Sequence, residues 1–219
     1  MNRAEEDYIK TIYELTVEKK QVLIKSNEIA EQFGYTVQSV NEMIKKLEKK
    51  HMVSFVPYKG ISITKKGKEA AIRMIRAHRI WEVFLTEKLG FSWEKVHEDA
   101  EMLEHATSSA VLEKLYHFLG EPKYCQHGNP IPNQAGHIEI KNQMMLAQCQ
   151  KGDIFLIERV MDTKPLLDFL DQHHLSLNDQ IKLIDIDAFN EMIQIKNETQ
   201  NIWMNIQTAQ MIFGKVIKR

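Results

Sequence analysis

The chain has 219 residues and a formal net charge of −1, with 43% hydrophobic and 27% charged residues. These values are ordinary for a globular protein and allow one large domain or two to three small ones. No apolar run approaches the roughly 20 residues of a membrane-spanning helix, and MNRAEEDYIK contains no signal-peptide core. Cys125 and Cys149 stand alone, without a CxxC motif or a framework of pairs. From these three observations together we expect a cytoplasmic protein without a membrane partner.

The charges are unevenly distributed along the chain. Between Lys45 and Arg73 there are nine lysines or arginines against two acids. Between Glu94 and His105 there are five acids and one lysine. The first segment is typical of a region that binds polyanions, and the second of a region that binds cations.

The N-terminal third predicts a group of short helices. Residues 5–19 carry apolar side chains near a 3.6-residue period, which indicates an amphipathic helix. Asp7 on its first turn, taken alone, is better explained by a simple interaction with the helix dipole. Two short helices should follow, one from an N-cap at Ser26 to Gly34 and one from an N-cap at Thr36. Such a pair is typical of a helix-turn-helix.

Residues 53–63 alternate apolar and polar side chains on either side of a turn at 58–60, which predicts a β-hairpin and therefore a winged helix. Polar side chains near the start of the second helix suit base edges, and lysines suit phosphates. A protein-docking module is the alternative, but lysines on both helix and hairpin favour nucleic acid. The residues expected to contact DNA are Thr36, Gln38, Ser39, Asn41, Lys45, Lys46 and Lys59.

Residues 67–90 and 93–119 are predicted to form long helices, the second in one or two pieces. Their wide apolar faces favour a two-fold homodimer. Histidines and carboxylates recur on them three and four residues apart, which brings the side chains onto one helix face. A solvated acidic face is the alternative, but repeated pairs on neighbouring helices favour a divalent metal site with mixed nitrogen and oxygen ligands. These residues are His78, Glu82, His97, Glu101, Glu104 and His105.

Regular structure is interrupted between residues 121 and 136 by prolines and glycines. Cys125 and His127 in this loop are two potential zinc ligands, which is far short of a four-ligand site. Beyond it, short apolar runs around a helix at 163–174 predict several strands, and hence a small barrel or sandwich.

The order of these parts and the strings EDYIKTIYEL, HRIWEVFL, KVHEDAEMLEH and HGNPIP resemble the diphtheria toxin repressor family of metal-dependent transcriptional regulators. The match is closer to its manganese-responsive, three-domain branch. The resemblance implies a non-enzymatic, homodimeric repressor that binds an inverted-repeat operator in double-stranded DNA. It also implies a mainly α protein with a small all-β domain: a winged helix-turn-helix domain (1–73), a helical metal-binding and dimerisation domain (74–141) and a FeoA-like barrel of the Src-homology-3 type (142–219).

The resemblance also implies two metal sites. The primary site would consist of Asp7, Glu101, Glu104 and His105. The ancillary site would consist of His78, Glu82 and His97, completed by Asp162 or, as a second choice, Glu158. Asp7 and Glu101 stand where iron-responsive members have Met and Cys, which favours manganese(II), with iron(II) as the alternative. Lys10 stands where two-domain manganese members have Glu, which argues against their binuclear cluster.

Three rival interpretations are weaker. A zinc peptidase would need HExxH, but Glu101 stands where the second histidine belongs. A di-iron oxidase would need two Glu-x-x-His motifs, and Glu101 is followed three residues later by Glu104. A metal-independent winged-helix regulator that senses a small molecule is the best alternative.

Overall fold

The computed structural model describes the chain except residues 19–20, 57–58, 94, 140–141 and 219. The chain forms two compact units. The first contains residues 1–78, 103–107 and 132–137, and the second contains residues 79–102, 108–131 and 138–219. The division into domains ending at residues 73 and 141 differs from these units, and residue 141 lies outside the described part. It therefore stays a prediction.

The first unit begins with α1 (Arg3–Tyr13), which continues into a π-helical turn, η1 (Glu14–Glu18). This confirms the predicted amphipathic helix, whose apolar face is buried at Tyr8, Ile9 and Ile12. A capping box starts α1: the Asn2 side chain accepts a hydrogen bond from the Glu5 N–H, and the Glu5 carboxylate accepts one from the Asn2 N–H. The capping box thus fixes the start of α1, and with it the position of the acidic residues on the first turn.

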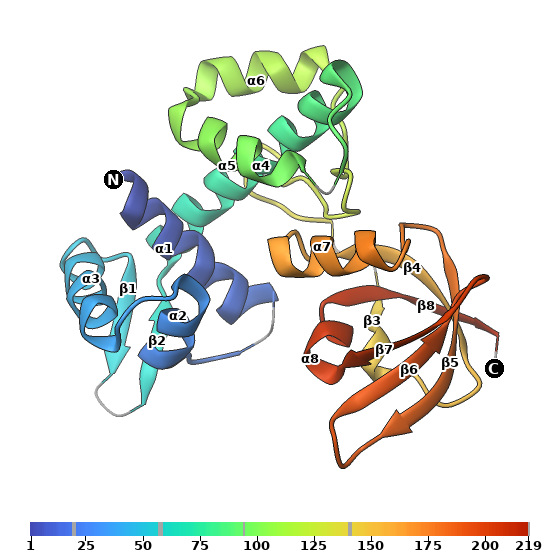
Figure 1. Cartoon of the computed structure of the whole chain (residues 1–219). Coiled ribbons are helices and arrows are strands. Elements are labelled where there is room, and N and C mark those ends of the chain that lie inside the picture. Colours follow the sequence, from blue (N-terminus) through green and yellow to red (C-terminus); the bar gives the residue numbers. More distant parts are fainter. Residues whose placement is uncertain (19–20, 57–58, 94, 140–141, 219) are drawn as a thin grey trace. The chain divides into compact units, whose positions relative to one another are not determined.

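The helix-turn-helix consists of α2 (Ser26–Phe33) and α3 (Val37–Lys49), drawn in blue in Figure 1. Gly34 joins them with φ 66°, a left-handed conformation that glycine adopts easily. Thr36 caps α3 as predicted, because its side chain accepts a hydrogen bond from the Ser39 N–H. The prediction of Ser26 as an N-cap is wrong. Lys25 holds that position, and its N–H donates to the Glu28 carboxylate at 2.8 Å.

The predicted wing is an antiparallel hairpin of β1 (Val53–Val56) and β2 (Gly60–Ile63), with Val53 opposite Ile63. Residues 57–58 of the expected turn lie outside the described residues. Gly60 has φ 138°, and a Cβ there would lie 2.7 Å from the Ile24 carbonyl oxygen. Glycine is therefore needed where the wing pairs with the segment before α2.

Three further helices are α4 (Lys65–Leu89), α5 (Val96–Ala106) and α6 (Ser109–Phe118). The region predicted as one or two helices is thus two, because the Ser108 side chain caps α6 by accepting from the Val111 N–H. Among the described residues, no helix is long and apolar enough to cross a membrane.

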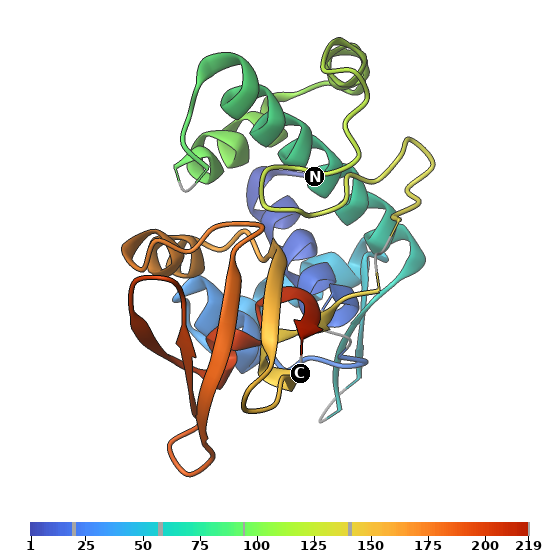
Figure 2. The same ribbon diagram turned by 90° about the vertical axis from the view of Figure 1, so that its right-hand side faces the viewer.

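The second unit contains a six-stranded antiparallel sheet with the strand order β3-β8-β4-β5-β6-β7. Figure 2 shows this sheet from another side. Its core is formed by alternate strand residues such as Phe155 and Ile157, and by Leu166 and Leu170 of the helix α7. The mainly α fold with a small all-β domain is confirmed, whereas β3 and α8 were not predicted. The elements are β3 (Met144–Met145), η2 (Leu146–Gln148), β4 (Ile154–Val160), α7 (Lys164–Gln172), β5 (Gln180–Asp187), β6 (Met192–Lys196), β7 (Asn201–Asn205), α8 (Ile206–Ala209) and β8 (Ile212–Lys218).

Candidate metal centre and nucleic-acid interface

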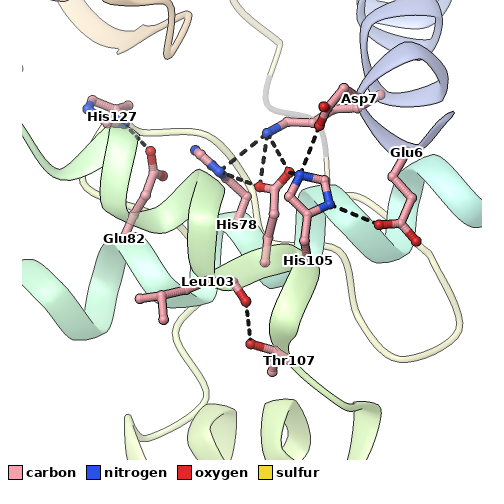
Figure 3. Close-up of polar contacts among 10 residues, drawn as sticks. Glu6, Asp7, His78, Glu82, Leu103, His105, Thr107 and His127 are labelled. Atoms are coloured by element: carbon pink, nitrogen blue, oxygen red, sulfur yellow. Dashed lines mark hydrogen bonds and ion pairs between the residues drawn. The ribbon is translucent and has the colours of Figure 1, made fainter. Parts of the chain in front are cut away.

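Within the first unit, α1 meets the end of α5 through Asp7, Glu104 and His105, which we call the primary cluster (Figure 3). These side chains offer ligand atoms that all lie within 4.8 Å of one another. His105 Nε2 lies 2.8 Å from Asp7 Oδ1 and 3.7 Å from Glu104 Oε1. Three of the four predicted primary ligands are therefore brought together.

The two ring nitrogens of His105 have different surroundings, as is typical of a metal-binding histidine. Its Nδ1 lies 2.9 Å from Glu6 Oε2. Its Nε2 is buried and makes no hydrogen bond of acceptable geometry within the described part of the chain. A buried nitrogen without a hydrogen bond is costly unless an ion or proton satisfies it. With two carboxylates beside it, this nitrogen fits a divalent cation.

Lys10 adds a buried positive charge next to the primary cluster. Its Nζ donates to both oxygens of Glu104 at 3.0 and 3.1 Å, and lies 3.3 Å from His78 Nδ1. His78 Nδ1 also lies 2.5 Å from Glu104 Oε2. Burial raises the pKa of Glu104, but Lys10 and His78 outweigh burial and hold this pKa below its usual range. Glu104 is thus kept ionised, as a metal ligand must be.

The other predicted ligands fall in different places. Glu101 lies on α5 one helical turn before His105, but it belongs to the second unit, so its part in the primary site stays a prediction. His78 belongs to the first unit, whereas Glu82 and His97 belong to the second. The predicted ancillary site therefore also stays a prediction.

The second unit contains a cluster that the sequence interpretation discounted, consisting of Glu82, Cys125 and His127, which we call the second cluster. His127 Nδ1 lies 3.0 Å from Glu82 Oε1, and His127 Nε2 lies 2.8 Å from the Trp93 carbonyl oxygen. All three side chains of the cluster are buried. The CxH spacing was the signal in the sequence, and the third ligand comes from α4, 43 residues earlier than Cys125.

Electrostatics in the second cluster follow from burial and from the Glu82 carboxylate. Burial, together with the Glu82 carboxylate, raises the pKa of the Cys125 thiol to about 11, although His127 and Arg79 act in the opposite direction. For His127, burial lowers the pKa, but Glu82 and Cys125 outweigh burial and raise it well above its usual range. A metal would have to displace protons from both groups to bind there.

The two candidates from the C-terminal part differ in their surroundings. Glu158 accepts a hydrogen bond from Gln143 Nε2 at 3.2 Å and lies 2.8 Å from Lys215 Nζ. Asp162 is half-buried between β4 and α7. Among the described residues of the second unit, neither is grouped with Glu82, Cys125 and His127, so the part of Asp162 or Glu158 in the ancillary site stays a prediction.

The expected DNA-contacting residues lie on α3, at its N-cap and in the wing. Thr36, Gln38 and Ser39 are exposed, as are Lys45, Lys46 and Lys59. Asn41 differs, because it is only half exposed and its Oδ1 accepts a hydrogen bond from Ser26 Oγ at 2.6 Å. Because the Asn41 carbonyl oxygen is engaged by Ser26, only the amide N–H groups of Asn41 would be available to a DNA base. Any base contact of Asn41 would therefore depend on Ser26.

Three family models match successive parts of the chain. They are "Iron dependent repressor, N-terminal DNA binding domain" (residues 1–61), "Iron dependent repressor, metal binding and dimerisation domain" (64–133) and "FeoA domain" (144–216). The structure is similar to that of the manganese regulator SloR, with 35% identity, a TM-score of 0.85 and coverage of 97% of this chain and 98% of SloR.

Two further relatives differ in the metal that their names carry. The manganese complex of a manganese-dependent transcriptional repressor is 28% identical, with a TM-score of 0.83 and coverage of 97% of this chain and all of the other. The iron-dependent repressor IdeR of Mycobacterium tuberculosis is 32% identical over 127 residues, which are 58% of this chain. That match spans about half of IdeR, 54% of its length.

A winged helix, a buried carboxylate–histidine cluster and a FeoA-type sheet in one chain define a DNA-binding regulator that responds to a metal ion. The chain belongs to the iron-dependent repressor family, in its three-domain form. Because the named homologues are a regulator and two repressors, this chain is a regulatory protein and not an enzyme.

Proposed function

We propose that this chain is a manganese(II)-dependent repressor that binds an inverted-repeat operator as a homodimer in the cytoplasm and controls metal-ion uptake. The observation that supports the metal dependence is the buried Nε2 of His105, which faces Asp7 and Glu104 without a hydrogen bond within the described residues. Iron(II) dependence is the alternative within the family, and a small-molecule sensor is the alternative outside it.

The donor set supports manganese. Asp7 and Glu104 supply oxygen and His105 supplies one imidazole nitrogen, with Glu101 proposed as a further oxygen donor. Manganese(II) suits carboxylate oxygen, whereas thiolate and thioether ligands select softer metals. The family relatives SloR and the repressor solved with manganese carry manganese in their names, which agrees with this choice.

The coupling to DNA follows from the position of α1. Asp7 on α1 would hold the metal together with Glu104 and His105, and the positive charge of the ion would offset the charges of the carboxylates. Two residues before Asp7, Glu5 pairs at 2.7 Å with Lys50 at the end of α3. A shift of α1 is therefore passed to the proposed recognition helix, so metal and DNA should each raise the affinity for the other.

Exposed apolar side chains in the second unit support the homodimer. Leu89, Met102, Val111 and Phe118 lie on the ends of α4 and α5 and along α6, with exposed fractions between 51% and 67%. Apolar surface of this kind is typical of association between subunits. We also propose the three-domain division at residues 73 and 141.

Equilibrium dialysis of the purified protein with manganese(II) tests the metal dependence. We expect at least one bound ion per chain, together with tighter binding to an operator duplex in a gel-shift assay. A protein that binds DNA equally well with manganese and with a chelator would favour the small-molecule sensor.

The recognition helix gives a prediction that separates base reading from phosphate binding. Gln38→Ala should cost roughly 1–3 kcal/mol on the preferred sequence and relax the preference at one position of each half-site. Lys45→Ala should weaken binding to all sequences and reduce the salt slope of log K by about one per subunit. Fluorescence anisotropy on matched duplexes at several salt concentrations measures both. Equal weakening on every duplex by Gln38→Ala would contradict the proposed orientation of α3.

The second cluster gives a prediction about metal stoichiometry. Cys125→Ala should remove a second metal equivalent, because it removes one of three converging ligands. His97→Ala tests the ancillary site in the same way. In that site Glu82 would bind the metal together with His78 and His97, and Asp162 would be the fourth ligand. Calorimetric titration decides between them: loss of the second equivalent in His97→Ala or Asp162→Ala, but not in Cys125→Ala, would support the ancillary set.

A further inference from the structure

Glu6 contacts His105 of the primary cluster at Nδ1, the ring nitrogen opposite the one that faces Asp7 and Glu104. Glu6 and Asp7 are consecutive residues of α1, and they approach opposite nitrogens of the His105 ring (Figure 3). The Glu6 side chain is 15% exposed and that of His105 is 8% exposed, so solvent competes little for their hydrogen bond. Because Glu6 lies on the Nδ1 side, it cannot share an ion with Nε2, Asp7 and Glu104.

The chemistry of imidazole assigns a different task to Glu6. A neutral imidazole has one N–H and one lone pair, and an ionised carboxylate can only accept a hydrogen bond. The Asp7 carboxylate lies 2.8 Å from Nε2 but outside hydrogen-bond geometry, whereas Glu6 is hydrogen-bonded to Nδ1 at 2.9 Å. The Glu6 carboxylate therefore favours the tautomer with hydrogen on Nδ1. The lone pair then lies on Nε2, the buried nitrogen that faces Asp7 and Glu104.

We propose that Glu6 is a positioning residue of the metal centre, which holds His105 in the Nδ1–H tautomer and directs Nε2 to the metal. The inference rests on the proposed metal-dependent function and adds a residue to it. Acceptors behind metal-binding histidines fix the ring and raise its basicity, and their loss typically lowers metal affinity 10–100-fold.

The second cluster contains the same arrangement with the nitrogens exchanged. His127 Nε2 is hydrogen-bonded to the Trp93 carbonyl oxygen, and Nδ1 is buried beside Glu82 without a hydrogen bond of acceptable geometry in the described residues. In both clusters an acceptor lies behind one ring nitrogen and a carboxylate lies beside the other, but in the second cluster a metal would first have to displace a proton from His127. The difference is that Glu6 is a charged acceptor, whereas the Trp93 carbonyl is neutral.

The test compares Glu6→Ala and Glu6→Gln with the control Glu31→Gln, which changes an exposed glutamate of α2. Manganese(II) affinity is measured by dialysis, and the His105 tautomer by ¹⁵N NMR of the metal-free protein, in which no ion fixes the position of the ring hydrogen. We expect Glu6→Ala to lose 10–100-fold in manganese affinity and the Nδ1–H signal. Glu6→Gln should lose less, because its side-chain carbonyl still accepts a hydrogen bond, and Glu31→Gln should match the wild type.

Wild-type manganese affinity in Glu6→Ala, or an unchanged Nδ1–H signal in both Glu6 variants, would overturn the inference. If Glu6→Ala does not fold, Glu6→Gln decides by the same two measurements. Failure of the proposed function gives a different result, since the wild-type protein itself would then bind no manganese.

Discussion

His105→Ala should give a folded protein that no longer responds to manganese(II). His105 supplies the buried Nε2 of the primary cluster, and it is the one histidine in the group that it forms with Asp7 and Glu104 among the described residues. Loss of an outer acceptor typically costs 10–100-fold in metal affinity, so loss of a direct ligand should cost at least about 100-fold. Calorimetry for the metal and gel-shift assays with and without manganese measure the effect.

His117→Ala is the matched control, because this histidine is exposed and pairs only one turn along the chain with the exposed Glu121. It should bind manganese and DNA as the wild type does. Circular dichroism and sedimentation confirm that both variants are folded and equally associated. Undiminished metal-stimulated DNA binding by His105→Ala would refute the assignment of the primary cluster.

Lys10→Met should strongly destabilise the metal-free protein. Its ammonium group pairs with Glu104, whose side chain is fully buried, and Lys10 itself is only 10% exposed. Removing one partner of a buried ion pair leaves an uncompensated charge, which costs about 3–5 kcal/mol. Urea denaturation of the metal-free protein measures the loss, and added manganese should restore part of it by binding to Glu104.

Lys50→Met is the control for Lys10→Met, because Lys50 is 47% exposed in its ion pair with Glu5. An ion pair with one solvent-exposed partner contributes roughly 0–1 kcal/mol. The double variant Lys10→Met with Glu104→Gln should recover much of the lost stability, since no buried charge is then left. A cost of Lys10→Met no greater than that of Lys50→Met would contradict the proposed role of Lys10.

The stability that the Lys10–Glu104 ion pair contributes should depend on pH in a defined direction. Because the pKa of Glu104 is lowered in the folded protein, the ion pair stabilises the fold above the unfolded pKa of about 4.3. This stabilisation is lost as the pH falls through the lowered folded-state pKa. In Lys10→Met the ammonium group no longer opposes burial, so the folded-state pKa of Glu104 should be higher than in the wild type. The stability difference between the two proteins should therefore shrink as the pH falls from the folded-state pKa of the variant to that of the wild type.

The winged helix and two residues of the primary cluster were predicted from local signals. Helical spacing relates Glu101 to Glu104 and to His105, whereas Asp7 was assigned only through the resemblance to the family. The acceptor role of Glu6 could not be predicted in the same way, because the sequence does not say which nitrogen of His105 a carboxylate will meet. Ser26 looked like an N-cap, but its hydroxyl donates to Asn41 instead.

The second cluster was missed for a related reason. Cys125 and His127 lie in a loop with no regular period, and their third neighbour, Glu82, comes from a helix whose spacing predicted a different partner, His78. Packing of that loop against α4, rather than sequence spacing, brings the three side chains together. The two-residue strand β3 likewise gives too short a pattern to recognise.

The most direct test of manganese dependence is an anaerobic titration of the wild-type protein with manganese(II) and with iron(II), measuring its affinity for one operator duplex. Shells of oxygen and nitrogen ligands generally bind iron(II) more tightly than manganese(II), so preference must be judged by activation of DNA binding and not by metal affinity. We expect manganese to activate DNA binding at least as strongly as iron, and both far more than a chelator-treated sample. Stronger activation by iron than by manganese would contradict the assignment.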